Sequence, residues 1–144
     1  MQQPTSRDTI LALDVGSVRI GVARANIVAR LPEPLTTLIM SDKIHAAIAE
    51  LIDEHKAGLL VVGLPRSLAS TETQQTKSVR QFAEDLKNHI HIPIFFQEEA
   101  LTSQKAQEHL QSKKYRGKPP TIDELAATYI LEDYLAEHMT KENS

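Results

Sequence analysis

The chain has 144 residues, a net charge of −3 and the charged and apolar content of an ordinary globular protein, which predicts a single domain over 1–144 with polar tails at 1–8 and 138–144. It contains no cysteine, so disulfide frameworks and thiolate metal sites are excluded, and only oxygen and imidazole ligands remain. The sequence has no membrane-length apolar run, no signal peptide and no overall basic character, which predicts a cytoplasmic protein that could bind nucleic acid only through a local patch.

Apolar runs and helical periods follow one another along the chain without a linker or a repeat. In order, they predict strands at 9–15, 18–25 and 34–39, a helix at 41–56, a strand at 59–64, a helix at 72–88, a strand at 92–96, and helices at 102–112 and 121–137. Ser41 is the expected N-cap of the first helix, and Gly58 is expected to end it. Helices between successive strands imply parallel pairing, whereas the first two strands are close enough to be antiparallel neighbours. The predicted fold class is α/β, a mixed five-stranded sheet flanked by helices.

The first predicted strand runs directly into Asp14, and the chain then turns through Gly16 into a second apolar strand. A carboxylate at this edge needs a metal, a phosphate or a basic partner, because burial of an unpaired charge is costly. Gly16 is expected to provide conformational freedom for the turn, and Gly21 to let another segment pass close to the second strand. A solvated turn aspartate is the alternative. A phosphate-binding hairpin of the sugar-kinase and actin-like type begins in the same way, but it needs two such domains, and this length supplies one.

Acidic residues end or begin predicted elements at three distant places: Asp14, the pair Glu98 and Glu99, and Asp123. Such acids suit Mg²⁺ or Mn²⁺, and two ions about 3.5–4 Å apart can clamp the attacking and leaving oxygens of a phosphodiester. The six histidines show no ligand spacing and are expected at the surface. The acids are therefore the candidate metal ligands.

The same acids also have structural explanations. Thr121 and Glu124 form the pattern of a capping box, and Asp123 in the first helical turn is favoured by the helix dipole. Glu98 and Glu99 suit a solvated turn before a helix. Each position taken alone therefore leaves a structural role open.

A basic loop precedes the last predicted helix. It holds Lys113, Lys114, Tyr115, Arg116 and Lys118. Four positive charges around an aromatic ring suit phosphate contacts with a base stacked on Tyr115. A solvated loop is the alternative.

The segments LALDVGSVRIGVA, LLVVGLPRSL, EEALTSQKA and IDELAATYILEDYL occur in the order typical of the YqgF family. This family is also known as the RuvX-like Holliday junction resolvases and as the pre-16S rRNA nucleases, and the resemblance covers roughly residues 9–135. It implies a ribonuclease H-like fold of strand order 3-2-1-4-5, a cytoplasmic location and an Mg²⁺- or Mn²⁺-dependent endonuclease. The implied partner is precursor small-subunit rRNA, free or within a ribosomal particle, with cleavage at the 5′ end of 16S rRNA.

The resemblance also implies which residues do the chemistry. The family's first-strand aspartate falls on Asp14, the glutamate of its Asp-Glu-Arg-Leu-Thr motif on Glu99, and its last-helix aspartate on Asp123. These three are the predicted catalytic and metal-binding residues. In the implied strand order the fifth strand lies two positions from the first, so Asp14 and Asp123 are the better direct ligands. The predicted substrate-binding residues are Arg19, Lys113, Lys114, Tyr115 and Arg116.

The chain departs from the family pattern at several positions. The motif arginine is replaced by Ala100, Val18 stands where the family has a lysine, and the loop at 66–71 lacks the usual glycines. These changes keep two alternatives open: a non-catalytic RNA- or ribosome-binding module, and a resolvase of DNA junctions. Junction resolution normally needs a symmetric dimer, and no dimer surface is evident, so a monomer is expected.

Overall fold

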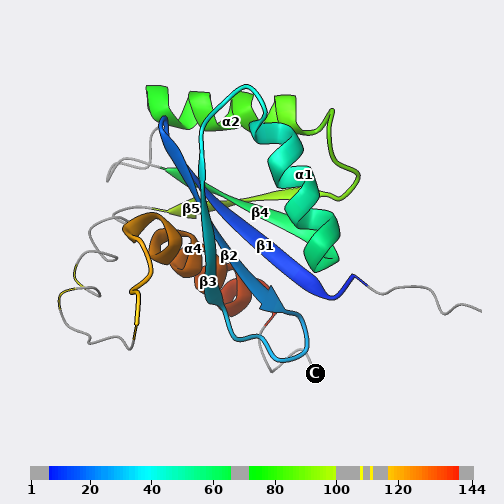
Figure 1. Cartoon of the computed structure of the whole chain (residues 1–144), viewed down its shortest axis with the longest axis vertical. Coiled ribbons are helices and arrows are strands. Elements are labelled where there is room, and N and C mark those ends of the chain that lie inside the picture. The colour runs from blue at the N-terminus through cyan, green and yellow to red at the C-terminus, as the bar shows by residue number, and fades with distance from the viewer. Residues whose placement is uncertain (1–6, 66–71, 100–107, 109–110, 112–116, 140–144) are drawn as a thin grey trace, which may run out of the picture.

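The computed structural model describes residues 7–65, 72–99, 108, 111 and 117–139 (Figure 1). Its elements are β1 (Thr9–Val15), β2 (Arg19–Asn26), β3 (Glu33–Ile39), α1 (Ile44–His55), β4 (Ala57–Pro65), α2 (Gln74–Leu86), β5 (Ile94–Glu99) and α4 (Ile122–His138). Of the helix predicted at 102–112 the structure describes only residues 108 and 111, both helical, and most of the two predicted tails also lies outside the described residues. No helix in the described part of the chain is long and apolar enough to cross a membrane.

The five strands form one mixed sheet of order β3-β2-β1-β4-β5, which confirms the predicted fold class and strand order. The hairpin strands β1 and β2 pair antiparallel, as do β2 and β3, whereas β1, β4 and β5 are parallel. The central strand β1 is buried over Ile10 to Leu13, because helices cover both faces of the sheet there. The carboxyl ends of the three parallel strands meet at one edge.

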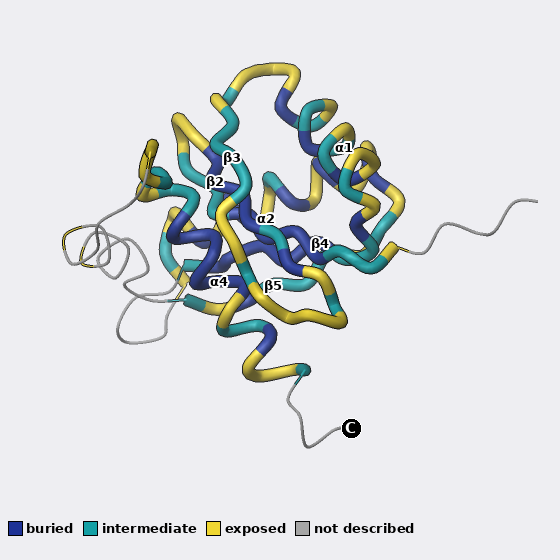
Figure 2. Tube along the Cα trace, turned by 60° about the horizontal axis from the view of Figure 1, so that its bottom comes forward, coloured by how far each residue is buried: buried dark blue, intermediate teal, exposed yellow. Residues whose placement is uncertain are grey.

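The two faces of the sheet are covered by different helices, α1 and α2 on one face and α4 on the other (Figure 1). The buried residues lie along the strands and along parts of these helices (Figure 2). On one face, large aliphatic side chains such as Leu11, Leu13 and Val22 pack against α1 and α2. On the other face, Ala12 and Ala23 pack against α4. The difference in side-chain size lets α4 lie closer to the strands than the other two helices could.

Three predicted element ends are wrong. Glu98 and Glu99 belong to β5 rather than to a turn, because the neighbouring strand continues to Pro65, which pairs with Glu99. Helix α1 begins at Ile44 after a turn that contains Ser41, rather than with Ser41 as its N-cap. It ends before Lys56, whose left-handed conformation (φ 55°) terminates the helix, whereas Gly58 lies in β4.

Two histidines, His45 and His55, depart from the prediction that all six lie at the surface. The His55 side chain is only 16% exposed, and its Nδ1 lies 3.2 Å from Nη1 of Arg24. His45 is half-buried, and its ring stacks on Phe82 and His89 with centroids 5.2 and 4.9 Å apart. Its Nε2 is buried, and within the described residues this atom makes no hydrogen bond. The stacking therefore places His45 in the packing between α1 and the end of α2.

Candidate active site

Asp14 lies at the carboxyl end of the central strand. It is the last residue but one of β1, and strand alternation places its side chain on the α4 face with Ile10 and Ala12. Its partner on β2 is Gly21. Asp14 is therefore a half-buried carboxylate on the side of the sheet that α4 covers.

Helix α4 touches the strand backbone at the residue opposite Asp14. A Cβ added to Gly21 would lie 1.9 Å from the carbonyl oxygen of Asp123 and 2.9 Å from its Cβ, so no side chain fits here. This confirms the expectation that Gly21 lets another segment pass close to the second strand. Because Gly21 pairs with Asp14 and contacts Asp123, it brings two carboxylates together from residues far apart in the chain.

The turn of this hairpin uses its glycine differently from the prediction. Gly16 is not among the described residues of positive φ. Its amide donates a hydrogen bond to the carbonyl of Arg19 at 2.9 Å, and a Cβ on Gly16 would lie 2.7 Å from that oxygen. The turn therefore requires a residue without a side chain at position 16. The hydrogen bond from Gly16 to Arg19 closes the turn where β2 begins.

The Asp14 carboxylate is in an unfavourable place for a negative charge. Burial, and then the charge of Asp123, raise the pKa of Asp14 from 3.8 to about 6. Within the described residues, no hydrogen bond or ion pair reaches this carboxylate. At neutral pH the group is thus ionised without a compensating donor, a condition that a bound cation would relieve.

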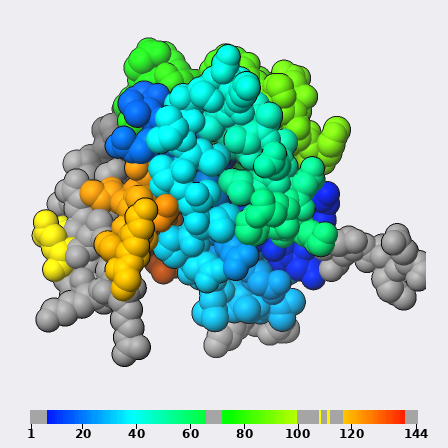
Figure 3. Space-filling view, in the orientation of Figure 1, coloured from blue at the N-terminus to red at the C-terminus, as the bar shows by residue number. Residues whose placement is uncertain are grey.

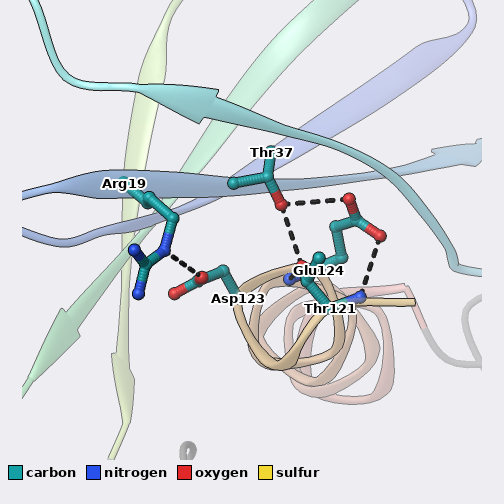
Figure 4. Close-up of polar contacts among 5 residues, drawn as sticks. All are labelled: Arg19, Thr37, Thr121, Asp123 and Glu124. Carbon is teal, nitrogen blue, oxygen red and sulfur yellow. Dashed lines mark hydrogen bonds and ion pairs between the residues drawn. The ribbon is translucent and has the colours of Figure 1, made fainter. Parts of the chain in front are cut away.

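Asp123 has a basic partner, whereas Asp14 does not. Arg19, the first residue of β2, donates from Nε to Oδ2 of Asp123 at 3.0 Å (Figure 4). The structure therefore joins a predicted substrate-binding residue to a predicted metal ligand. The two residues are far apart in the sequence, and no local pattern in it signals the contact.

A network of hydroxyl and carboxylate groups holds the first turn of α4 (Figure 4). Thr121 and Glu124 form the predicted capping box, each side chain bonding to the other residue's backbone amide. From β3, Thr37 Oγ1 lies 2.8 Å from Thr121 Oγ1 and donates to Glu124 Oε2 at 3.0 Å. Figure 3 shows this start of α4, in orange, lying against β3, in cyan. Sequence reasoning missed Thr37, because a lone strand threonine carries no local signal.

Glu99 reaches the same edge of the sheet from β5. The register places Asp14 level with Gly63 on β4, and Gly63 pairs with Gln97, so Glu99 lies two residues further along its strand. Gln97 is buried and donates from Nε2 to the carboxylate of Glu137 on α4, at 3.1 and 3.2 Å. Alternation then puts Glu99 on the α4 face as well. Gln97 was missed too, although a lone amide after the apolar run Ile94 to Phe96 was a usable signal.

The structure brings two of the three predicted acids together and keeps the third apart. Within the described ranges, no group of three or more histidine, aspartate or glutamate side chains is close enough to hold one ion. Asp14 and Asp123 form the close pair, and Glu99 lies farther along the edge. Asp14 and Asp123 are neighbouring carboxylates that repel each other. Such a pair fits Mg²⁺ or Mn²⁺, because these ions prefer oxygen ligands and keep other coordination positions for water or phosphate.

The remaining predicted substrate-binding residues lie outside the described part of the chain. These are Lys113, Lys114, Tyr115 and Arg116. Ala100, which stands in place of the family's arginine, lies outside it too.

Comparisons with known proteins agree with this geometry. The RuvX family, described as Holliday junction resolvase, matches residues 8–137. A protein of Sulfurihydrogenibium sp. (strain YO3AOP1) is 38% identical over 128 residues, which cover 88% of each chain. One of Thermoanaerobacter pseudethanolicus is 36% identical over 137 residues, covering 92% of this chain and 99% of the relative. Both carry the name "Putative pre-16S rRNA nuclease".

Two groups of solved structures share the fold. Thermus thermophilus RuvC in complex with a Holliday junction substrate aligns with a TM-score of 0.53 at 13% identity, over 92% of this chain and 97% of that one. The fowlpox virus Holliday junction resolvase aligns with a TM-score of 0.56 at 11% identity, over 91% and 99%. At these identities the likeness establishes a ribonuclease H-like fold of the RuvC type and nothing finer.

Proposed function

Because the chain belongs to the RuvX family, we propose that it is a divalent-metal-dependent endonuclease that processes the 5′ end of precursor 16S rRNA. The observation that carries the proposal is the contact at Gly21, which places Asp14 beside Asp123 at the carboxyl edge of the parallel strands. The raised pKa of Asp14 supports a site that gains stability when a cation binds. The names of the relatives support the choice of RNA as substrate.

Each acid has a defined part in this proposal. Asp14 and Asp123 would hold the cation, and Glu99, which lies farther along the edge at the end of β5, would approach it only with the full length of its side chain. A divalent ion held there would lower the pKa of water and stabilise the leaving alkoxide. The cleavage leaves a 3′-hydroxyl and a 5′-phosphate.

Basic residues bind the RNA backbone in this proposal. Arg19 is half exposed beside Asp123, so its guanidinium can reach a phosphate that approaches the acids. Lys113, Lys114 and Arg116 contact flanking phosphates, and Tyr115 stacks on a base. The proposed enzyme works as a monomer in the cytoplasm, on free precursor rRNA or on a ribosomal particle.

The direct test is the substitution Asp14→Asn. We expect it to abolish Mg²⁺-dependent cleavage of a precursor 16S rRNA fragment, because asparagine keeps the shape but removes the ligand charge. Gel analysis of a 5′-labelled fragment measures the rate, and gel-shift measurements follow RNA binding. The matched control is Asp42→Asn, at an exposed aspartate before α1, which should cleave like the parent. An Asp14→Asn variant that cleaves at the parental rate would contradict the proposed mechanism.

A DNA junction is the second candidate substrate, favoured by the family description and by the solved structures of similar fold. The same assay with a four-way DNA junction separates the two: faster Asp14-dependent cleavage of the junction than of the RNA would select the resolvase function. Light scattering would then be expected to show a dimer. RNA binding without cleavage of either substrate would indicate a non-catalytic binding module.

A further inference from the structure

The ion pair between Arg19 and Asp123 joins two residues whose proposed roles require different partners. Asp123 is a proposed metal ligand, and Arg19 is proposed to bind phosphate. In the structure the two side chains bind each other, through one hydrogen bond of 3.0 Å from Arg19 Nε to Asp123 Oδ2 (Figure 4). While this ion pair persists, the guanidinium of Arg19, and not a metal ion, neutralises the carboxylate of Asp123.

This pair is of a kind that a stronger cation can open. The Arg19 side chain is 53% exposed and that of Asp123 29% exposed, so water screens their attraction. Only Nε of Arg19 is engaged, and its two Nη groups make no hydrogen bond within the described residues. The bidentate geometry that makes arginine–carboxylate pairs strong is therefore absent.

The charges at this edge are also unbalanced. Two carboxylates, Asp14 and Asp123, face one guanidinium, and Arg19 contacts only Asp123. A divalent cation between the two acids neutralises both. The same ion repels a guanidinium that lies 3.0 Å from one of its ligand oxygens, so the ion and the arginine compete for Asp123.

We propose that Arg19 exchanges partners: it pairs with Asp123 in the metal-free protein and is released to a phosphate of the nucleic acid when a divalent cation binds Asp14 and Asp123. This inference rests on the proposed function for its metal site. The released guanidinium keeps its place at the start of β2, beside the edge where a scissile phosphate must lie. The planar guanidinium can then donate hydrogen bonds to two phosphate oxygens at once. It cannot do so with Nε while Nε is bound to the carboxylate of Asp123.

The exchange has a thermodynamic consequence. Because the cation frees the group that binds phosphate, cation binding and nucleic-acid binding strengthen one another, and by linkage each raises the affinity for the other. A variant without Arg19 loses this part of the coupling. The same variant binds the cation more tightly when nucleic acid is absent, because nothing competes for Asp123.

The chain offers a matched control on the same strand. Arg24 donates from Nε to Glu33 Oε1 at 2.7 Å, and its Nη1 lies 3.2 Å from Nδ1 of His55. It is a partly exposed β2 arginine in an ion pair, like Arg19, but it lies toward the opposite end of the strand from the acids. Changes that follow from general charge or folding should affect both arginines alike.

The first experiment follows the Nε–H signals of both arginines by NMR during an Mg²⁺ titration without nucleic acid, with Arg19→Lys and Arg24→Lys used for assignment. We expect the Arg19 signal to shift to the position of a solvated guanidinium as Mg²⁺ saturates, and the Arg24 signal to stay. An Arg19 signal that keeps its position at saturating Mg²⁺ would overturn the exchange.

The second experiment measures affinities in Arg19→Gln and Arg24→Gln. By calorimetry, we expect Arg19→Gln to bind Mg²⁺ about tenfold more tightly than the parent, since one competing positive charge is gone, and Arg24→Gln to match the parent. With Ca²⁺ as the cation and a precursor rRNA fragment followed by fluorescence anisotropy, the cation should strengthen RNA binding several-fold less in Arg19→Gln than in the parent. Equal strengthening in both would overturn the release of Arg19 to phosphate.

The outcomes separate this inference from the proposed function. Arg19 release on Mg²⁺ binding by a protein that cleaves no RNA would sustain the exchange and refute the nuclease. Asp14-dependent cleavage with Arg19 still bound to Asp123 would do the reverse. Absence of Mg²⁺ binding to the parent protein would overturn both.

Discussion

The two faces of the sheet pack against helices through different sets of side chains. On the face of α1 and α2, the strands present leucine, isoleucine and valine, and the helices rest on those side chains. On the face of α4, the strands present the large side chains Ile10 and Val61, and among them the small residues Ala12, Ala23, Ala25, Gly21 and Gly63. The first face resembles any aliphatic core, whereas the second lets a helix approach the strand backbone.

The difference explains why the candidate site lies on the α4 face. An aliphatic layer can repack when one side chain changes, so it positions a helix only approximately. At Gly21, the backbone of α4 itself lies against the strand, and neither partner can rotate away. The backbone contact between Gly21 and Asp123 therefore fixes where the carboxylate of Asp123 lies relative to Asp14. A metal site needs this kind of constraint, because its ligands must be held close to one geometry.

The largest effect is expected from Gly21→Ala. The new Cβ would lie 1.9 Å from the carbonyl oxygen of Asp123, so α4 must move away from β2. We expect a loss of about 3 kcal/mol in the free energy of unfolding, at the upper end for overpacking, together with loss of Mg²⁺ binding. Urea denaturation and calorimetry measure the two quantities.

The control for this substitution lies on the same face. In Gly63→Ala the added Cβ would lie 2.3 Å from Cδ1 of Ile130, the far end of a flexible side chain on the same helix. Rotation of Ile130 can relieve that contact, so the loss should be about 1 kcal/mol with Mg²⁺ binding retained. Equal losses in both variants would show that the backbone contact at Gly21 constrains α4 no more than the side-chain contact at Gly63 does.

The fold was largely predictable from the sequence because its signals are local. The apolar run into Asp14 marks the central strand, and the helical periods between later strands indicate parallel pairing. The capping box at Thr121 marks the start of α4. The end of β5 was not predictable, because Gln97, Glu98 and Glu99 are polar and remain in the strand only through pairing with β4.

The sequence indicated the residues of the candidate site but not the contacts among them. Asp14 and Asp123 each stand at an element end, where an acid is conspicuous. Their approach depends on Gly21, and the sequence indicated only that some segment would pass there. The pairing of Arg19 with Asp123 has no local signature, since the two residues are distant and each has an ordinary structural explanation. Thr37 is hidden for the same reason.

A smaller effect, of opposite sign, is expected from Asp14→Asn in the metal-free protein. The pKa of Asp14 is raised from 3.8 to about 6 in the folded state. Ionisation of this group therefore destabilises the folded protein fully above about pH 6. The destabilisation decreases as the pH falls from about 6 to 3.8, and it is absent below pH 3.8. Asparagine carries no charge, and we expect the variant to be about 2 kcal/mol more stable near neutral pH. Urea denaturation in the presence of a chelator should show this advantage shrinking as the pH falls from about 6 to 4. An advantage that does not change with pH would mean that the charge of Asp14 is not its source.

The smallest effect is expected from Thr37→Val, which tests whether side chains add to what the backbone contact at Gly21 provides. Valine keeps the shape but loses the hydrogen bonds to Thr121 and Glu124, so the free energy of unfolding should fall by about 1 kcal/mol. The control is Thr36→Val, on the neighbouring residue, whose side chain faces the other side of the sheet by strand alternation and should tolerate the change. Because α4 still rests on Gly21 in both variants, Mg²⁺ affinity by calorimetry should change by no more than about twofold. A larger loss in Thr37→Val would show that this network, and not the glycine contact alone, holds Asp123 in place.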